Sequence, residues 1–310
     1  MTENDMLSAR FLGSLLGVAL GDAIGELAFR YPDEAPLRQA IASSNTLTYT
    51  DDTAMAIALA ESLIAQSRVD TQHLGDTFRA HYEREPWRGY ASGPPTIFAQ
   101  VARHGGDYTA IAQTLFNGQG SYGNGAAMRV APAGLYFHAD ADLYAQVRHT
   151  AVVTHTHPIG IDGAAVLAKA IALALTLDPS EALPRAAFIA ELRGFARTAA
   201  MQEQLAQLET QLAQEATASS AGRRLGSGVA AHQSVPFAIY AFLRQPDSFE
   251  DCLFCAALHS GDRDTVAAMA CAIAGAYLGS AALPPAWLEK LENREHIEAL
   301  ARGLYARSRQ

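Results

Sequence analysis

Two short acidic clusters, far apart in the chain, carry the clearest chemical signal in the sequence. Residues 50–53 read Thr-Asp-Asp-Thr, and residues 262–265 read Asp-Arg-Asp-Thr. Each cluster stands directly before an apolar, alanine-rich stretch with helical spacing. Asp and Thr at the start of a helix accept backbone N–H groups and complement the helix dipole, but one such residue per helix is enough. The additional oxygen atoms indicate a role beyond capping.

If the two helix starts meet in the fold, the four carboxylates of the clusters share one pocket. Like charges at such short range cannot all stay ionised unless cations are present. Carboxylate and hydroxyl oxygens are hard ligands, which suit Mg²⁺, Mn²⁺ or Ca²⁺ better than zinc. The clusters therefore predict a metal site, with capping of two separate helices as the alternative.

Composition excludes several classes of protein. The 310 residues are 49% hydrophobic and 18% charged, which is ample material for a deep core. The net charge of −9 argues against a nucleic-acid-binding surface, because phosphate recognition needs basic residues. The longest apolar stretch, residues 164–177, contains Lys169 and is too short for a membrane span. Three cysteines and the lack of an N-terminal signal segment predict a cytoplasmic protein that binds no membrane.

Apolar residues recur with helical rather than alternating spacing almost throughout the chain. The sequence therefore predicts an all-α protein, and we expect a single compact domain over residues 1–310. The polar stretch 217–224 is expected to be a loop. The main predicted helices cover residues 11–23, 51–67, 71–85, 95–104, 108–117, 126–137, 140–155, 159–177, 187–198, 201–216, 234–243, 249–258, 264–278, 285–291 and 295–308.

Two further segments are suited to ligand binding. Residues 118–125 contain four glycines directly before the helix expected near Ala126. Backbone N–H groups of such a loop can form an anion-binding nest at a helix start, although a plain connecting loop has the same composition. Residues 154–158, Thr-His-Thr-His-Pro, are expected to end a helix. They lack the further ligands of a zinc site, so a histidine that lines a ligand pocket or closes the helix is the better interpretation.

Taken together, these segments resemble the ADP-ribosylglycohydrolase family. The similarity rests on residues 21–25 (Gly-Asp-Ala-Ile-Gly), 49–53, 120–125 and 261–265, which occur in the family's order. Thr154-His155 and residues 226–228 (Gly-Ser-Gly) also match. The resemblance covers most of the chain, from Phe11 to Gly279. It implies a compact orthogonal helical domain with a centre of two Mg²⁺ or Mn²⁺ ions at the base of a cleft.

The resemblance also assigns roles to individual residues. The implied metal ligands are Thr50, Asp51, Asp52, Asp262, Asp264 and Thr265, with Asp51 and Asp264 between the two ions. The implied substrate-binding residues are Asp22, in a supporting role, together with Gly120, Ser121, Tyr122, Gly123, Asn124, His155, Gly228 and Val229. The catalytic candidates are Asp51, Asp52 and Glu26, with Asp52 as the first choice for general acid or base.

One position departs from the family pattern. Several members carry a glutamate seven residues after the aspartate that matches Asp22, and this chain has Phe29 there. The nearest acidic residues are Glu26, Asp33 and Glu34. Either one of these replaces the glutamate, or the protein functions without it.

The activity that the resemblance implies is metal-dependent hydrolysis of an N- or O-glycosidic bond to ADP-ribose. The expected substrates are ADP-ribosylated proteins or small ADP-ribose conjugates, and the expected enzyme is a monomer. Two alternatives stay open at this point. One is an ADP-ribose-binding module without turnover, which the change at Phe29 would explain. The other is a two-metal phosphoesterase, which would release AMP instead of ADP-ribose.

Overall fold

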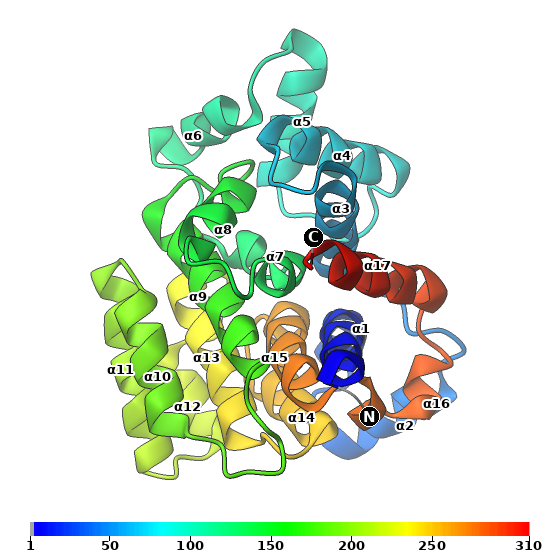
Figure 1. The fold of residues 1–310 in the computed structure, drawn as a ribbon, viewed down its shortest axis with the longest axis vertical. Coiled ribbons are helices and arrows are strands. Elements are labelled where there is room, and N and C mark those ends of the chain that lie inside the picture. The colour runs from blue at the N-terminus through cyan, green and yellow to red at the C-terminus, as the bar shows by residue number, and fades with distance from the viewer. Residues whose placement is uncertain (1–2, 310) are drawn as a thin grey trace.

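The computed structural model describes residues 3–309, and within this range the chain forms helices and no named strand (Figure 1). The prediction of an all-α fold is confirmed. The helices are α1 (Glu3–Arg30), α2 (Glu34–Ser43), α3 (Asp51–Gln66), α4 (Thr71–Arg84), α5 (Gly93–His104), α6 (Tyr108–Gly118), α7 (Ala131–Tyr136), α8 (Leu143–Ala151), α9 (Pro158–Ala174), α10 (Arg185–Phe195), α11 (Ala199–Ala213), α12 (Ala218–Leu225), α13 (Ala231–Arg244), α14 (Phe249–His259), α15 (Arg263–Leu278), α16 (Pro285–Leu288) and α17 (Arg294–Arg307).

Helices α1 and α15 lie side by side at the centre of the fold (Figure 1). Their backbones touch because α1 has a glycine at every fourth position on the side that faces α15: Gly13, Gly17, Gly21 and Gly25. A Cβ atom at any of these positions would overlap the main chain of α15, for example at Ala267 or Asp264. The close approach places Asp22, next to this glycine stripe, beside the first turn of α15.

Helix α3 completes the arrangement that positions the acidic clusters. It packs against α1, α4, α7 and α17, and its first turn approaches the first turn of α15. Its inward residues, among them Met55, Leu59 and Leu63, belong to the same buried apolar cluster as Phe11 and Leu20 of α1. Burial of this many apolar side chains fixes both helix starts on rigid elements.

The central helix α1 is also apolar enough to resemble a membrane span. Residues 4–30 are long and apolar enough to cross a membrane, but 83% of their most apolar stretch is buried inside the fold. The packing of α1 against α15 and α17 accounts for its composition.

Three local predictions are wrong. The expected loop at 217–224 is helix α12, capped by the Thr217 hydroxyl, which accepts a hydrogen bond from the Ser220 N–H. Helix α12 buries Ala221 and Leu225 on one face, a short amphipathic pattern hidden by its small polar residues. Helix α2 was not expected. No α-helix starts near Ala126, because residues 124–126 form a single 3₁₀ turn and α7 begins only at Ala131.

Candidate active site

The two acidic clusters meet where α3 and α15 begin. The Thr265 hydroxyl donates to the carboxylate of Asp52, with its oxygen 3.2 Å from both carboxylate oxygens. Asp51 and Asp264 both line two cavities that meet at this point. Asp262 lies close enough to Asp51 to influence its pKa. The expectation that the two helix starts come together is thus met, although they are separated by most of the chain.

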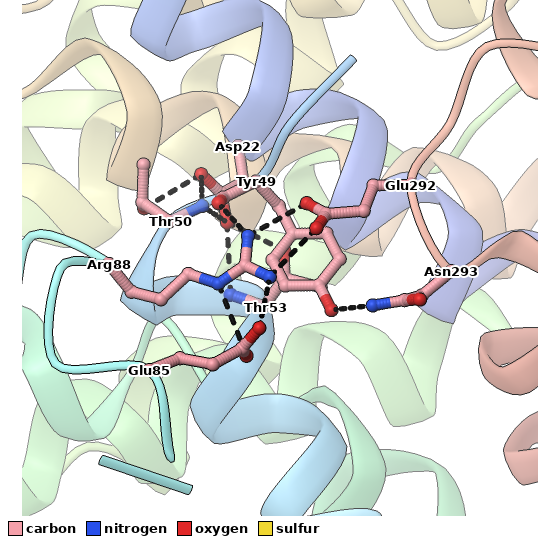
Figure 2. A network of polar contacts seen from close by, with 8 residues as sticks. All are labelled: Asp22, Tyr49, Thr50, Thr53, Glu85, Arg88, Glu292 and Asn293. Atoms are coloured by element: carbon pink, nitrogen blue, oxygen red, sulfur yellow. Dashed lines mark hydrogen bonds and ion pairs between the residues drawn. The ribbon is translucent and has the colours of Figure 1, made fainter. Parts of the chain in front are cut away.

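A fifth carboxylate, Asp22 of α1, holds the first cluster in place (Figure 2). It accepts hydrogen bonds from the backbone N–H and the hydroxyl of Thr50, at 3.0 and 2.8 Å. It also accepts from the N–H and hydroxyl of Thr53, at 3.0 and 2.6 Å. Asp22 is fully buried and lines neither of the two cavities at this cluster. This position suits the predicted role of Asp22, which is to support the residues of the first cluster.

The carboxylates in this cluster disfavour each other's ionisation. Burial, opposed by the hydrogen bonds from Thr53 and Thr50, raises the pKa of Asp22 to about 6. Burial and the charges of Asp22 and Asp264 raise the pKa of Asp51 to about 7. Burial also raises the pKa of Asp52 well above its ordinary value, and that of Asp262 to about 6. The cluster therefore has a strong electrostatic demand for positive charge.

Two cavities meet at this cluster. The first, the glycine-side cavity, has a volume of about 310 Å³. The second, the Glu26-side cavity, has a volume of about 460 Å³. Asp51, Gly89 and Asp264 line both. Gly89 has a φ of +91°, and a Cβ atom there would lie 3.6 Å from an Asp51 carboxylate oxygen, so its lack of a side chain keeps the junction open.

The glycine-side cavity contains many of the residues predicted to bind the substrate. Those on its wall are Ser121, Gly123, Asn124, His155 and Val229, and the predicted metal ligands Asp51, Asp262, Asp264 and Thr265 also line it. Gly120, Tyr122 and Gly228 are close in sequence but are not part of this wall. Tyr122 is half exposed to solvent.

Backbone hydrogen bonds fix the glycine-rich loop against the segment before α13. The Asn124 N–H donates to the Val229 carbonyl at 2.9 Å, and the Ala231 N–H donates to the Tyr122 carbonyl at 3.1 Å. Gly120 has a φ of +72°, and a Cβ atom there would overlap the Thr156 hydroxyl. The loop therefore has a fixed shape that requires glycine, but it leads into a 3₁₀ turn and not into the expected helix start.

A buried hydrogen-bond chain sets the protonation of His155. Arg129 donates to the Thr154 hydroxyl oxygen at 2.8 Å, and that hydroxyl lies 2.8 Å from Nδ1 of His155. Because arginine can only donate, the Thr154 proton is free to point at Nδ1. The neutral ring then carries its proton on Nε2, the nitrogen beside Gly125. Burial, with the Arg129 charge, lowers the pKa of His155 to about 3, so the ring stays neutral.

Thr154→Val is expected to weaken the binding of free ADP-ribose about tenfold, because His155 loses the partner that fixes its tautomer and Arg129 loses an acceptor. Thr154→Ser keeps the hydroxyl and should bind like the wild type. Calorimetric titration of both variants measures the effect. Equal affinity of Thr154→Val and Thr154→Ser would contradict this role for the hydroxyl.

Several residues on the wall of the glycine-side cavity were not predicted. They are Arg129, Phe116, Met55, Met128 and residues 89–94 except Tyr90. Arg129 had a signal, since a lone arginine in the apolar run 126–131 must find buried partners. Phe116 had none. It is exposed because the backbone of α6 leaves helical geometry at residues 115–117, with a φ of +53° at Phe116.

The family resemblance implies two Mg²⁺ or Mn²⁺ ions, and the donor chemistry of this site suits them. The available ligands are oxygen atoms, and the raised pKa values show that cations would relieve repulsion. As the side chains stand in residues 3–309, no three His, Cys, Asp or Glu residues converge on one ion position. Asp262 accepts a hydrogen bond from Asn124 at 2.6 Å, and Asp52 accepts from Thr265. Binding of an ion would replace these contacts.

The side chain of Arg263, between the two aspartates of the second cluster, points away from them. Its guanidinium donates to the Ala257 carbonyl at 3.0 Å, on α14. Phe29 is half exposed in the last turn of α1 and lines neither cavity. Glu26, one turn earlier, lines the Glu26-side cavity. Of the acids considered as replacements for the family glutamate, Glu26 is the one on a wall of either cavity.

An ion-pair network around Arg88 supports the segment that leads into the first cluster (Figure 2). Arg88 is buried, donates to the Tyr49 carbonyl at 2.8 Å and lies 4.3 Å above the Tyr49 ring. Its guanidinium also binds both carboxylate oxygens of Glu292, at 2.7 and 2.9 Å, and the carboxylate of Glu85. Asn293 donates to the Tyr49 hydroxyl. Tyr49 directly precedes Thr50, so residues before α17 help to position the cluster.

Comparisons with known proteins identify the family of this chain. The sequence model of the family described as ADP-ribosylglycohydrolase matches residues 3–310. The chain is 34% identical to the ADP-ribosylhydrolase ARH3 of Bos taurus, over 96% of this chain and 92% of that protein. For ARH3 of Homo sapiens, the identity is also 34%, over 96% and 93%.

A solved structure titled ADP-ribosylglycohydrolase-related protein complex has the same fold. It superimposes with a TM-score of 0.73 at 26% sequence identity and covers 98% of this chain and 99% of its own. The family match, the relatives and the shared fold all span nearly the whole chain. The chain therefore belongs to the ADP-ribosylglycohydrolase family and is an enzyme of the glycosyl-hydrolase type.

Proposed function

We propose that this protein hydrolyses the N- or O-glycosidic bond between ADP-ribose and a protein or small-molecule acceptor, and that it needs two divalent cations to do so. One observation carries the proposal. Two cavities of different character meet at Asp51, Gly89 and Asp264, so a ligand can extend across the carboxylate cluster. The bond to be cut would lie at this junction.

The glycine-side cavity is suited to the ADP-ribose part. The backbone of Gly123 and Gly125 lies on its wall without side chains in the way, and the Nε2 proton of neutral His155 can donate to a ligand oxygen. Arg129 adds a buried positive charge, and burial lowers its pKa only to about 9, so it stays protonated at neutral pH. These features favour a ligand rich in phosphate and hydroxyl oxygens.

The carboxylate cluster would hold the cations. Thr50, Asp51, Asp52, Asp262, Asp264 and Thr265 are the proposed ligands. Bound Mg²⁺ or Mn²⁺ would orient the ribose hydroxyls and stabilise charge that develops during cleavage. Asp22 keeps Thr50 and the start of α3 in place through its four hydrogen bonds.

Proton transfer is better assigned to Glu26 than to Asp52. Asp52 is fully buried, lines neither cavity and is bonded to Thr265, so it cannot reach a substrate. Glu26 lines the cavity on the leaving-group side. Burial and the nearby charge of Asp264, opposed by Arg30, raise its pKa above the ordinary value, a direction that suits a carboxyl group that donates a proton during catalysis.

Glu26→Gln is expected to lower kcat about 100-fold with little change in the affinity for free ADP-ribose, because only the proton-transfer group is lost. Glu34→Gln, on the exposed start of α2, is the matched control. Steady-state kinetics and ADP-ribose titration give both values. Unchanged kcat in Glu26→Gln would show that hydrolysis proceeds without this carboxylate.

The function itself is tested by release of ADP-ribose from a mixed set of ADP-ribosylated proteins and from O-acetyl-ADP-ribose. The assay is run with Mg²⁺, with Mn²⁺ and with EDTA. Metal-dependent release is expected, and the substrates that lose label identify the linkage. Release of AMP would instead support a phosphoesterase. ADP-ribose binding without any release would support the binding module, for which Phe29 at the family's glutamate position is the favouring observation.

We further propose that the enzyme works as a monomer in a reducing compartment such as the cytoplasm. Its three cysteines, Cys252, Cys255 and Cys271, are buried and form no disulfide. Burial raises the pKa of each thiol. Such thiols are unreactive packing residues. The fold therefore uses its cysteines in the reduced form, which fits a reducing compartment.

A further inference from the structure

We propose that the Glu26-side cavity binds a basic polypeptide segment around the modified residue, so that the enzyme prefers ADP-ribosylated sites flanked by Lys or Arg. The inference deepens the proposed function and rests on it. Two features of the cavity carry it, its charge and the exposed indole of Trp87.

The position of the Glu26-side cavity indicates that it receives the leaving group. It joins the glycine-side cavity at Asp51, Gly89 and Asp264, and its own wall also includes Glu26, Thr46 and Thr48. A ligand whose ADP-ribose fills the glycine-side cavity must direct its acceptor through this junction. The volume of about 460 Å³ accommodates several side-chain or backbone groups and exceeds what a small acyl group needs.

The charges of the two cavities differ once cations occupy the cluster. Cations would neutralise Asp51 and Asp264, which both cavities share, and Asp262, which lines the glycine-side cavity. The glycine-side cavity is then left with positive Arg129. The other cavity is left with Glu26.

Arg88 does not offset the charge of Glu26, although it is part of the same wall. Its guanidinium is bound to two carboxylates, Glu292 at 2.7 Å and Glu85 at 3.0 Å, so the group of three carries a net negative charge. Arg30, one turn beyond Glu26, interacts with the Glu26 charge, but it is exposed and lines neither cavity, so solvent screens it and it does not stand on the binding wall. Phosphate is therefore favoured on the glycine side, and a cation is favoured beside Glu26.

Trp87 supplies a second reason for a cationic partner. Its side chain is 72% exposed, while the adjacent Arg88 is buried in its ion pairs. A large exposed indole on the wall of a cavity is a binding surface, and its ring face attracts Lys and Arg side chains. Aromatic and acidic groups together select basic peptide over acidic peptide, whereas a small uncharged acceptor offers no cation to either group.

The test compares three substrates with the metal-loaded enzyme. Two are peptides with the same ADP-ribosylated residue, flanked by lysines in one and by glutamates in the other. The third is O-acetyl-ADP-ribose. The wild type should favour the lysine peptide over the glutamate peptide about tenfold in kcat/KM, and added salt should reduce this ratio. Trp87→Ala should lower kcat/KM for the lysine peptide about fivefold and leave O-acetyl-ADP-ribose unchanged.

Two further variants separate this effect from general damage. Thr48→Lys places a positive charge on the cavity wall and should reverse the preference between the two peptides. Thr210→Lys, at an exposed position of α11, is the control and should not change this preference. Phe116→Ala removes an exposed aromatic residue from the other cavity and should slow all three substrates alike.

The outcomes are distinguishable. Equal turnover of the two peptides by the wild type would overturn the inference and leave the hydrolase function intact. The same would follow if Trp87→Ala slowed O-acetyl-ADP-ribose as much as the lysine peptide. Lack of ADP-ribose release from every substrate would overturn the proposed function, and the inference with it.

Discussion

Asp262→Asn is expected to lower ADP-ribose release at least about 100-fold, because one of the proposed cation ligands loses its charge. The fold should persist. Asp262 stands at the start of α15 but its side chain caps no backbone N–H group. Its contact with Asn124 can be kept by the amide oxygen of the new asparagine.

The stability of this variant makes the experiment informative. Burial and the neighbouring Asp264 raise the pKa of Asp262 to about 6, so ionisation of this group costs free energy in the folded state. Without metal, Asp262→Asn should therefore melt no lower than the wild type. Asp251→Asn, at an exposed position in the first turn of α14, is the control and should keep full activity. Full turnover by Asp262→Asn would contradict the placement of the cations.

In the absence of metal, the protein should lose stability as the pH rises from about 4 to about 7. The sign follows from carboxyl groups whose pKa is raised in the folded state. Over this range the unfolded chain releases protons that the folded protein still holds, so folding is penalised increasingly. Asp22, Asp51 and Asp262 contribute, with pKa values of about 6, 7 and 6. For fully buried Asp22 alone, the cost is on the order of 2–3 kcal/mol.

Mg²⁺ should reverse this loss. Cations bind the ionised cluster of the folded protein and not the unfolded chain, and they compete with protons for the same oxygens. Melting curves with EDTA and with Mg²⁺, recorded at about pH 5 and about pH 8, measure this stabilisation by Mg²⁺. The rise in Tm caused by Mg²⁺ should be several degrees larger at the higher pH. Asp262→Asn should show a smaller Mg²⁺ effect. An equal rise at both pH values would indicate that Mg²⁺ binds elsewhere.

The sequence was most informative where the signal is local. Helical spacing of apolar residues is a short-range pattern, and it predicted the all-α fold and the main helices. The acidic clusters were visible for the same reason, since Asp and Thr at helix starts have a known local role that these clusters exceed. The glycines of α1 were also visible, but their function was not. Gly21 and Gly25 are needed because of the backbone of α15, which is distant in sequence.

Errors arose where tertiary contacts outweigh local preference. Helix α12 is made of small polar residues that favour a loop, yet burial of Ala221 and Leu225 stabilises it as a helix. The role of Asp52 as general acid or base is a different case and stays a prediction. Its side chain is buried against Thr265 and lines neither cavity, and for that reason we propose Glu26 instead.

The sequence by itself thus determined the fold class, the carboxylate cluster and the glycine-rich loop, because each depends on residue types and short spacings. Tertiary structure alone decided that the cluster lies between two cavities, that Arg88 is neutralised by Glu85 and Glu292, and that exposed Trp87 and Glu26 line the same cavity. These features depend on side chains from α1, α3, α15 and the segment before α17. Their proximity is set by helix packing over long sequence separations, which no local pattern records.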